Sequence, residues 1–300
     1  MATRKLLSSV VKPNTGSVSE SAYGITSDPL TQFAIVFSAL IHDVDHPGVS
    51  NAQLVKEETE VATLYNNKSV AEQNSITISW DLLMQSKFDD LRKAFIPTET
   101  EMKHFRQLLV NAVMATDLFD ADLKRLRENR WHKVFDDKDD KNPIDDEEDS
   151  NRRATIIIEH IIQASDVSHT MQHWHVYQKW NGKLLREMYE AYQSNRSDKD
   201  PTIGWYEGEL WFFDNYIIPL AKKLKTCGVF GVSCDELLDY AVDNRAEWAA
   251  KGRDIVVDHI ASLQQQQRPK SSSQVLASSP PLLGSLRLQI GNELGQISAL

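Results

Sequence analysis

The stretch FAIVFSALIHDVDHPGVSN, residues 33–51, determines how this chain is organised. Its apolar first half, Phe33–Ile41, ends abruptly in His42 and Asp43. Burying ionisable groups at the end of a core helix is unfavourable unless something compensates their charge. A bound cation is a natural compensator, because an imidazole nitrogen beside a carboxylate oxygen suits Zn²⁺ or a Mg²⁺/Mn²⁺ pair. The stretch therefore indicates a metal site at the end of a buried helix.

An alternative interpretation is that the His and Asp residues of this stretch only cap a helix and satisfy one another. Structural ion pairs often gather such residues, so an isolated His-Asp pair favours that alternative. The full pattern H-D-x-x-H-x-G-x-x-N, which runs from His42 to Asn51, reverses the preference and favours a metal site.

The composition excludes several other classes of protein. The chain has 300 residues, enough for one large domain or two small ones, and its net charge of -10 argues against nonspecific nucleic-acid binding. Its two cysteines, Cys227 and Cys234, are too few for a disulfide framework and fit a reducing, cytoplasmic location. No apolar run reaches the roughly 18 residues of a membrane span, and residues 1–12 lack the apolar segment of a secretory signal.

Apolar residues recur at helical spacing along most of the chain, and strand patterns nowhere dominate. The predicted fold class is therefore all-α, a compact multi-helix domain. The first helix is predicted at 29–42, with Asp28 or Ser27 as its N-cap and Pro29 at its first position. The other predicted helices cover residues 51–64, 70–83, 98–114, 154–193 (one long helix or two in succession), 205–224 (broken near Pro219) and 234–251.

Two segments are predicted to lack regular structure. Residues 136–149 are mostly acidic and contain Pro143, which indicates a solvated loop, and they do not fit the pattern of a calcium-binding loop. After Leu263 the chain becomes rich in Gln, Ser and Pro, which is typical of a disordered tail. The predicted organisation is one folded domain at 1–263 and a low-complexity tail at 264–300.

Carboxylates follow apolar helical faces at three places: Asp43, Asp117 and Asp166. Taken alone, Asp166 fits a capping or surface role slightly better than a ligand role. Together with His42 and Asp43, it can complete a mixed His/Asp site drawn from several helices. A di-metal centre of this kind polarises a phosphoryl oxygen and produces a hydroxide nucleophile at neutral pH.

The segment from His42 to Asn51 resembles the second metal motif of class I 3′,5′-cyclic-nucleotide phosphodiesterases. Four later landmarks agree with that family in order and rough spacing: LYNNKSVAE (64–72), ATD (115–117), ASDVS (164–168) and FFDNYIIPL (212–220). The match covers about residues 30–255. The segments HTMQHWH (169–175) and GELWFFDNY (208–216) also resemble divergent phosphodiesterases of diatoms and related algae, which are often joined to membrane and cyclase segments.

The resemblance implies an HD-type, all-α catalytic domain that hydrolyses the 3′ phosphoester bond of cAMP or cGMP in signal transduction. The family holds zinc through two His and two Asp, and a second ion, usually magnesium, through one shared Asp and waters; manganese is the alternative to magnesium. The expected partner is the cyclic nucleotide, with no nucleic acid and no membrane span in this chain. For a full-length parent the resemblance leaves open a homodimer or a fusion to membrane or cyclase segments.

Positions that match the family motifs receive expected roles from the resemblance. The first metal is expected on His42, Asp43 and Asp166, with Asp43 bridging to the second. Phe212 is expected to clamp the purine by stacking. The residues expected to orient water molecules around the metals are His46, Glu72, Thr116 and Asp117.

The sequence departs from the family pattern in its first motif, H-N-x-x-H, which supplies the general-acid His and one metal-binding His. No histidine precedes His42 in this chain. The simplest interpretation is that the chain begins too late and lacks the first metal motif. Absence of a general acid typically costs about 10² to 10⁴ in rate.

Other departures concern the nucleotide pocket and a neighbouring helix. The family's purine-selecting Gln corresponds to Glu209, which as a carboxylate only accepts hydrogen bonds, so cAMP and cGMP stay equally open; a solvent-facing helix position is the alternative for Glu209. His169 and His173 share a helical face with Asp166 and fit packing roles better than replacement ligands.

Three functional hypotheses follow. The first is a metal-dependent cyclic-nucleotide phosphodiesterase, a hydrolase. The second is a truncated or degenerate non-catalytic homologue that binds nucleotides or regulates a partner. The third is another HD-type phosphohydrolase, which has the His-Asp pair but lacks the Tyr-Asn and Phe-Phe-Asp landmarks.

Overall fold

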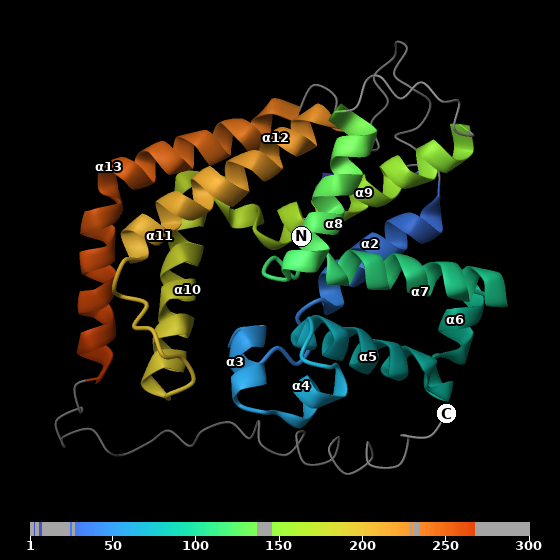
Figure 1. Ribbon diagram of the computed structural model, residues 1–300, viewed down its shortest axis with the longest axis horizontal. Coiled ribbons are helices and arrows are strands. Elements are labelled where there is room, and N and C mark those ends of the chain that lie inside the picture. The colour runs from blue at the N-terminus through green and yellow to red at the C-terminus, as the bar shows by residue number, and fades with distance from the viewer. Residues whose placement is uncertain are drawn as a thin grey trace. The chain divides into compact units, whose positions relative to one another are not determined.

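The computed structural model describes residues 28–136, 146–228 and 234–267, together with Thr3, Leu6, Leu7, Ile25 and Phe230. Every regular element in this part of the chain is helical, so the predicted all-α fold is confirmed (Figure 1). Residues 1–260 form one compact unit, and residues 261–300 form a second unit that lies mostly outside the described residues.

The helices are α2 (Pro29–Ile41), α3 (Asn51–Lys56), α4 (Glu60–Leu64), α5 (Val70–Met84), α6 (Asp89–Phe95), α7 (Glu99–Met114), α8 (Ala121–Trp131), α9 (Asp146–Asp166), α10 (Trp174–Gln193), α11 (Trp205–Phe212), α12 (Ile218–Thr226) and α13 (Cys234–Gln267). Short 3₁₀ turns occur at η2 (Ser86–Phe88) and η4 (Ser168–Met171). Single π-helical turns occur at η3 (His132–Asp136) and η5 (Phe213–Ile217).

Helix α2 begins as the sequence predicts, because Asp28 accepts hydrogen bonds from the backbone N–H of Leu30 at 3.0 Å and of Thr31 at 3.1 Å. Pro29 occupies the first helical position, where its missing N–H costs nothing. One face of α2 is buried, and the helix packs against α7, α9 and α5. This burial fixes the end of α2, where His42 follows.

The core around α2 and α7 is aromatic. Phe105 of α7 is fully buried and lies 5.8 Å, centroid to centroid, from Phe33 of α2 and 5.3 Å from Phe95 of α6. Helix α7 begins with a capping box in which Thr98 and Glu101 hydrogen-bond to each other's backbone N–H. The helix is thereby held at both its start and its centre, which positions the residues after Met114.

Helix α9 buries a stripe of isoleucines, and it packs against α2, α7 and α12. The stripe consists of Ile156, Ile157, Ile158, Ile161 and Ile162. Its spacing is the 3.6-residue period that the sequence shows. Three mutually packed helices, α2, α7 and α9, therefore carry the predicted site residues at their carboxyl ends (Figure 1).

The predicted single helix at 51–64 is wrong, because the structure has two helices there, α3 and α4. Glu58 adopts the left-handed conformation (φ 50°), its N–H donates to Val55, and the N–H of Thr59 donates to Leu54. Thr59 then caps α4 by accepting from the N–H of Ala62 at 3.2 Å. A helix-stopping motif followed at once by an N-cap separates the two helices.

Other boundaries also differ from expectation. The region 154–193 contains two helices, α9 and α10, with η4 between them, which is the second of the two predicted alternatives. The interruption in 205–224 is the π-helical turn η5, whereas Pro219 lies in the first turn of α12. Residues 146–149 belong to α9 rather than to a loop, and residues 137–145 lie outside the described part. Helix α13 continues to Gln267, past the predicted start of the tail, and residues 268–300 lie outside the description.

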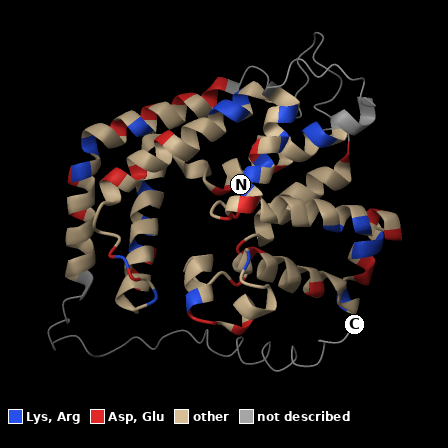
Figure 2. Cartoon of the chain, viewed as in Figure 1, with Lys and Arg blue, Asp and Glu red and all other residues tan. Residues whose placement is uncertain are grey.

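Charged residues of both signs are interspersed over the described helices, and α13 carries both along its length (Figure 2). Among the described residues, no helix is both long and apolar enough to cross a bilayer.

Candidate metal centre

His42 caps the carboxyl end of α2 and faces two carboxylates. Its Nδ1 lies 3.1 Å from the carbonyl oxygen of Ala39, which can only accept a hydrogen bond. In the neutral ring the proton therefore sits on Nδ1 and the lone pair on Nε2. That Nε2 lies 3.2 Å from Oδ2 of Asp43 and 3.3 Å from Oδ1 of Asp166. The imidazole is thus oriented as metal-binding histidines are, with one nitrogen on a backbone acceptor and the other directed into the site.

The three predicted ligands come together from chain positions more than 120 residues apart. His42, Asp43 and Asp166 each offer one ligand atom, and these atoms all lie within 4.8 Å of one another. They line a cavity of about 160 Å³ that Thr116 also borders. Asp43 and Asp166 are exposed, whereas His42 is partly buried, so the site opens to solvent on one side.

The negative charge around this cluster favours a bound cation. Burial lowers the pKa of His42, but hydrogen bonds to Asp166 and Asp43 and their negative charges together outweigh burial and raise the pKa to about 10. The hydrogen bond to His42 in turn holds the pKa of the Asp43 carboxyl below its usual value. The carboxyl ends of α2 and α9 add the negative ends of two helix dipoles.

These residues fit a divalent metal ion. Imidazole nitrogen and carboxylate oxygen are both ligands that zinc accepts, and the two carboxylates also suit harder ions such as Mn²⁺. The fit rests on three donor atoms that all lie within 4.8 Å of one another, close enough to bind one ion, and on a histidine tautomer fixed by Ala39.

A second polar group stands beside the cluster and is organised by Asn51. Its Nδ2 donates to Oε2 of Glu72 at 2.8 Å and lies 3.4 Å from Oδ2 of Asp117, while its Oδ1 accepts from the N–H of Ala71 at 2.9 Å. Burial raises the pKa of Glu72; the hydrogen bond from Asn51 opposes this shift, and the charge of Asp117 adds to it. Glu72 and Asp117, both predicted site residues, are therefore brought together by one amide.

His46 is exposed and belongs to the turn between α2 and α3. Its Nδ1 accepts a hydrogen bond from the N–H of Gly48 at 3.2 Å, which fixes the ring on its own loop. The ring lies near enough to both Asp43 and Glu72 to act electrostatically on each carboxylate.

The backbone of the turn that carries Thr116 and Asp117 is fixed by side chains of α8 and α9. Gln163 of α9 is buried and donates from Nε2 to the carbonyl of Ala115 at 2.9 Å. Arg127 of α8 donates from Nη2 to the carbonyl of Asp117 at 2.9 Å. The hydroxyl of Thr116 itself donates to the carbonyl of Val113 at 2.7 Å, at the edge of the metal cavity.

Glu209 is half-buried and hydrogen-bonded to α10, in contrast to the freely solvent-facing position of the alternative interpretation. Its Oε2 accepts a hydrogen bond from the hydroxyl of Tyr177 at 2.7 Å, and that hydroxyl lies 3.4 Å from Nδ2 of Asn181. Burial raises the pKa of Glu209, and the hydrogen bonds from Tyr177 and Asn181 oppose this shift. The carboxyl is thus held in one orientation by two side chains of α10.

Phe212 lies one turn after Glu209 and stacks on Tyr216, with ring centroids 5.3 Å apart and planes 18° from parallel. Tyr216 belongs to the π-helical turn η5, and its hydroxyl oxygen is buried without a hydrogen-bond partner. Burial raises the pKa of Tyr216, and the charge of Asp166 raises it further. Tyr216 thus stacks on Phe212 and lies near enough to Asp166 for the carboxylate charge to act on its hydroxyl.

His169 and His173 do not join the metal cluster that the described residues form. His169 is half-buried, and burial lowers its pKa. His173 lies beside Tyr240, whose hydroxyl is 3.2 Å from Nε2. The structure therefore favours packing roles for both, as expected.

Sequence reasoning missed several residues that organise the site. Asn51 stands in the quoted motif, but its bridging role was not predicted. Gln163, Tyr177 and Tyr216 carry no sequence signal, because their roles depend on contacts between distant helices.

Comparisons with known proteins agree with this geometry. A model of the 3′5′-cyclic nucleotide phosphodiesterase family matches residues 14–228. A Caenorhabditis elegans protein named as a probable 3′,5′-cyclic-AMP phosphodiesterase is 28% identical over 185 residues, covering 58% of this chain and 24% of that protein. A cGMP-specific 3′,5′-cGMP phosphodiesterase of Dictyostelium discoideum is 23% identical over 234 residues, covering 75% of this chain and 46% of that protein. The chain thus spans about a quarter to a half of the length of these two relatives.

The fold agrees as well. The phosphodiesterase domain of a RhoPDE fusion protein from the choanoflagellate Salpingoeca rosetta superposes with a TM-score of 0.62 at 21% identity, covering 87% of this chain and 76% of that chain. Since the family model covers well over half of the 300 residues and the solved domain shares the fold, this chain belongs to the 3′,5′-cyclic nucleotide phosphodiesterase family.

Proposed function

We propose that the protein hydrolyses the 3′ phosphoester bond of a cyclic nucleotide, giving a 5′-nucleoside monophosphate, with divalent metal held by His42, Asp43 and Asp166. The observation that carries the proposal is the convergence of these three donors within 4.8 Å at the carboxyl ends of packed helices. When bound, a divalent ion at such a site polarises a phosphoryl oxygen and lowers the pKa of bound water. Zinc at the cluster and magnesium or manganese beside it are the ions we propose.

The chain's own residues have assigned parts in this proposal. Ala39 fixes the tautomer of His42 so that Nε2 faces the metal. Asp43, which is exposed and shares the site with His42, would contribute its carboxylate to a second ion as well. Glu72 and Asp117, held together by Asn51, would accept hydrogen bonds from water near a second ion and so orient that water. Thr116 lines the metal cavity, and His46 acts electrostatically on Asp43.

The nucleotide is proposed to lie on the side of Glu209 and Phe212. Phe212 has an aromatic face supported from behind by the stacked ring of Tyr216, which suits stacking against a purine. Glu209 has one oxygen engaged by Tyr177, so the other can accept from an amino group of the base. Both adenine and guanine carry such donors, and the proposal therefore covers cAMP and cGMP.

One observation favours a second candidate, a non-catalytic nucleotide-binding homologue. Within these 300 residues, no position upstream of His42 matches the family's general-acid histidine. Such a protein would keep the metal cluster and the base pocket but leave the leaving-group oxygen without a proton donor.

Metal analysis combined with turnover separates the two candidates. Purified protein that holds near-stoichiometric metal and releases 5′-AMP from cAMP, or 5′-GMP from cGMP, supports hydrolysis and rules out the non-catalytic candidate. Protein that binds the cyclic nucleotide in equilibrium dialysis without turning it over supports the non-catalytic candidate. Protein that binds neither metal nor nucleotide contradicts both.

A cytoplasmic location is part of the proposal, since sparse cysteines fit a reducing compartment. Cell fractionation of the tagged native protein tests this. A homodimer, or a fusion in a longer parent, is likewise proposed from the family; sedimentation of the purified chain tests the first.

A further inference from the structure

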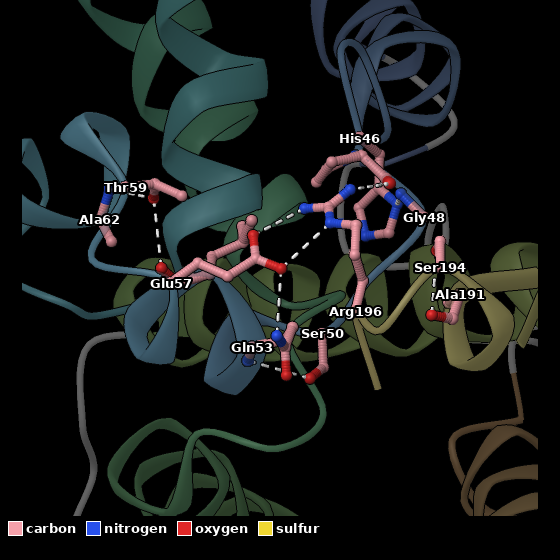
Figure 3. Close-up of polar contacts among 12 residues, drawn as sticks. His46, Gly48, Ser50, Gln53, Glu57, Thr59, Ala62, Ala191, Ser194 and Arg196 are labelled. Carbon is pink, nitrogen blue, oxygen red and sulfur yellow. Dashed lines mark hydrogen bonds and ion pairs between the residues drawn. The ribbon is translucent and has the colours of Figure 1, made fainter. Parts of the chain in front are cut away.

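A fork of hydrogen bonds joins the connection after α10 to the loop that follows His42. We call residues 43–50, between α2 and α3, the metal loop. Arg196 donates from Nε to Oε1 of Glu57 at 3.0 Å and from Nη2 to Oε2 of the same carboxylate at 2.8 Å. Its third group, Nη1, lies 3.3 Å from the carbonyl oxygen of Pro47 in the metal loop. Figure 3 shows the guanidinium between Glu57 and the loop.

Arg196 and Glu57 both stand at the end of a helix, where backbone hydrogen bonds fix the position of each residue. Asn195 takes the left-handed conformation (φ 58°) after α10, its N–H donates to Tyr192, and the N–H of Arg196 donates to Ala191 at 2.9 Å. Glu57 caps α3, and the left-handed Glu58 follows it. The ends of α10 and α3 therefore each have a left-handed residue, and the first end carries the guanidinium while the second carries the carboxylate.

An apolar layer lies next to this fork. Val49 of the metal loop and Leu54 of α3 are buried in one cluster, and Ala191 of α10 packs against that cluster. Gly48 is in the left-handed region (φ 72°), and a side chain built on it would meet Glu187 of α10 at 3.5 Å. The metal loop therefore rests directly on the last turns of α10.

The fork also has a distinct electrostatic signature. The hydrogen bond from Arg196 holds the pKa of Glu57 down, to about 2, with a further contribution from Gln53. Exposed ion pairs usually contribute little, because solvent screens them and ordering their side chains costs entropy. A bidentate guanidinium–carboxylate pair is geometrically specific, however, and here it aims a third donor at a backbone carbonyl of the metal loop.

We infer that Arg196 is a positioning residue for the metal centre: with Glu57 as its anchor, it holds the Pro47 backbone against α10 and so fixes the metal loop on which Asp43 and His46 stand. The inference rests on the proposed function. It also gives α10 a double role, since the start of the same helix orients Glu209 through Tyr177.

The test is Arg196→Gln in the full chain, with Arg196→Lys and Glu57→Gln beside it. Zinc affinity is measured by competition with a chromogenic chelator, and amide hydrogen exchange is followed over residues 43–52, both well below the thermal transition. We expect about tenfold weaker zinc binding for Arg196→Gln, at the low end for residues that orient ligands, and faster exchange at residues 48–50. Lysine keeps the charge but not the fork, so Arg196→Lys should be intermediate.

The matched control is Asp198→Asn. The ion pair of Asp198 with Lys56 joins the same two segments and includes no residue of the metal loop. The Asp198→Asn variant should leave zinc affinity and amide hydrogen exchange of the metal loop at wild-type values. The double variant Arg196→Gln/Glu57→Gln should match Arg196→Gln alone, because Glu57 acts through Arg196.

Different results would refute the metal site and the positioning role of Arg196. If Asp166→Asn loses zinc while Arg196→Gln matches Asp198→Asn in both measurements, the metal site stands and the positioning role is refuted. If the wild-type protein binds no zinc, the proposed function falls; faster exchange at residues 48–50 in Arg196→Gln then still supports the fork, and unchanged exchange refutes it.

Discussion

Acid should loosen α9, the helix that ends in Asp166, through a single buried histidine. His160 is 4% exposed, and in its neutral form Nδ1–H donates to the carbonyl of Ile156 at 2.7 Å. Burial lowers its pKa to about 4; the hydrogen bond to Ile156 opposes the shift, and the cations Lys223, Arg127 and Arg130 reinforce it. The native protein therefore keeps His160 neutral at pH values where an unfolded chain would protonate it.

The sign and size of the effect follow from linkage. The folded pKa, about 4, lies below the ordinary value of 6.5, so the contribution of His160 to stability is complete above pH 6.5. It is lost as pH falls from 6.5 to about 4, because the unfolded state binds a proton that the native state does not. At about 1.4 kcal/mol for each pH unit of that interval, the loss is about 3 kcal/mol.

Urea unfolding at a series of pH values between 4 and 7 measures this, with wild type compared against His160→Gln and His160→Phe. Carboxyls with raised pKa values, such as Glu159, contribute with the opposite sign, but they are common to all three proteins and cancel in the difference. We expect the wild type to lose about 3 kcal/mol relative to either variant across the interval. Parallel curves for the three proteins would refute the assignment.

Three further predictions concern the site. Asp166→Asn should abolish zinc binding, as measured by metal content after dialysis, whereas Asp45→Asn, at a left-handed position that Asn tolerates, should retain it. Gln163→Met removes the donor to the Ala115 carbonyl at nearly constant volume and should lower the free energy of unfolding in urea by about 1–3 kcal/mol. Tyr177→Phe should raise KM for the cyclic nucleotide several-fold with a smaller change in kcat, because it frees the orientation of Glu209; an unchanged KM would count against the proposed base pocket.

The sequence predicted the helices whose burial is periodic and the polar residues that come together where they end. Helices α2, α7 and α9 each bury a long apolar stripe, so their positions followed from local spacing, and His42, Asp43 and Asp166 followed from the polar residues after those stripes. The sequence pattern left the pairing of Asp166 with His42 as one possibility, and the resemblance assigned both residues to the same ion. The assignment of metal ions and nucleotide to particular site residues stays a prediction.

The break between α3 and α4 could not be predicted, and its cause is physical. Glu58 is an unfavourable residue for the left-handed conformation it adopts, so the local sequence reads as continuous helix. The stop is stabilised by backbone hydrogen bonds to Val55 and Leu54 and by Arg196, which reaches Glu57 from 139 residues away in the chain. A contact of that range leaves no trace in local periodicity.

Glu209 shows how burial could make one side chain resemble another. Its raised pKa keeps the neutral carboxyl, which has both a donor and an acceptor, present to a higher pH than in an ordinary glutamate. The neutral acid offers a base the same pair of groups as the amide of the family's Gln, whereas the carboxylate offers acceptors alone. Within the proposed pocket, KM for the cyclic nucleotide should therefore vary with pH in wild type and be flatter in Glu209→Gln, which retains an acceptor for Tyr177. Identical pH profiles of KM in the two proteins would show that Glu209 does not touch the base, whatever the metal cluster does.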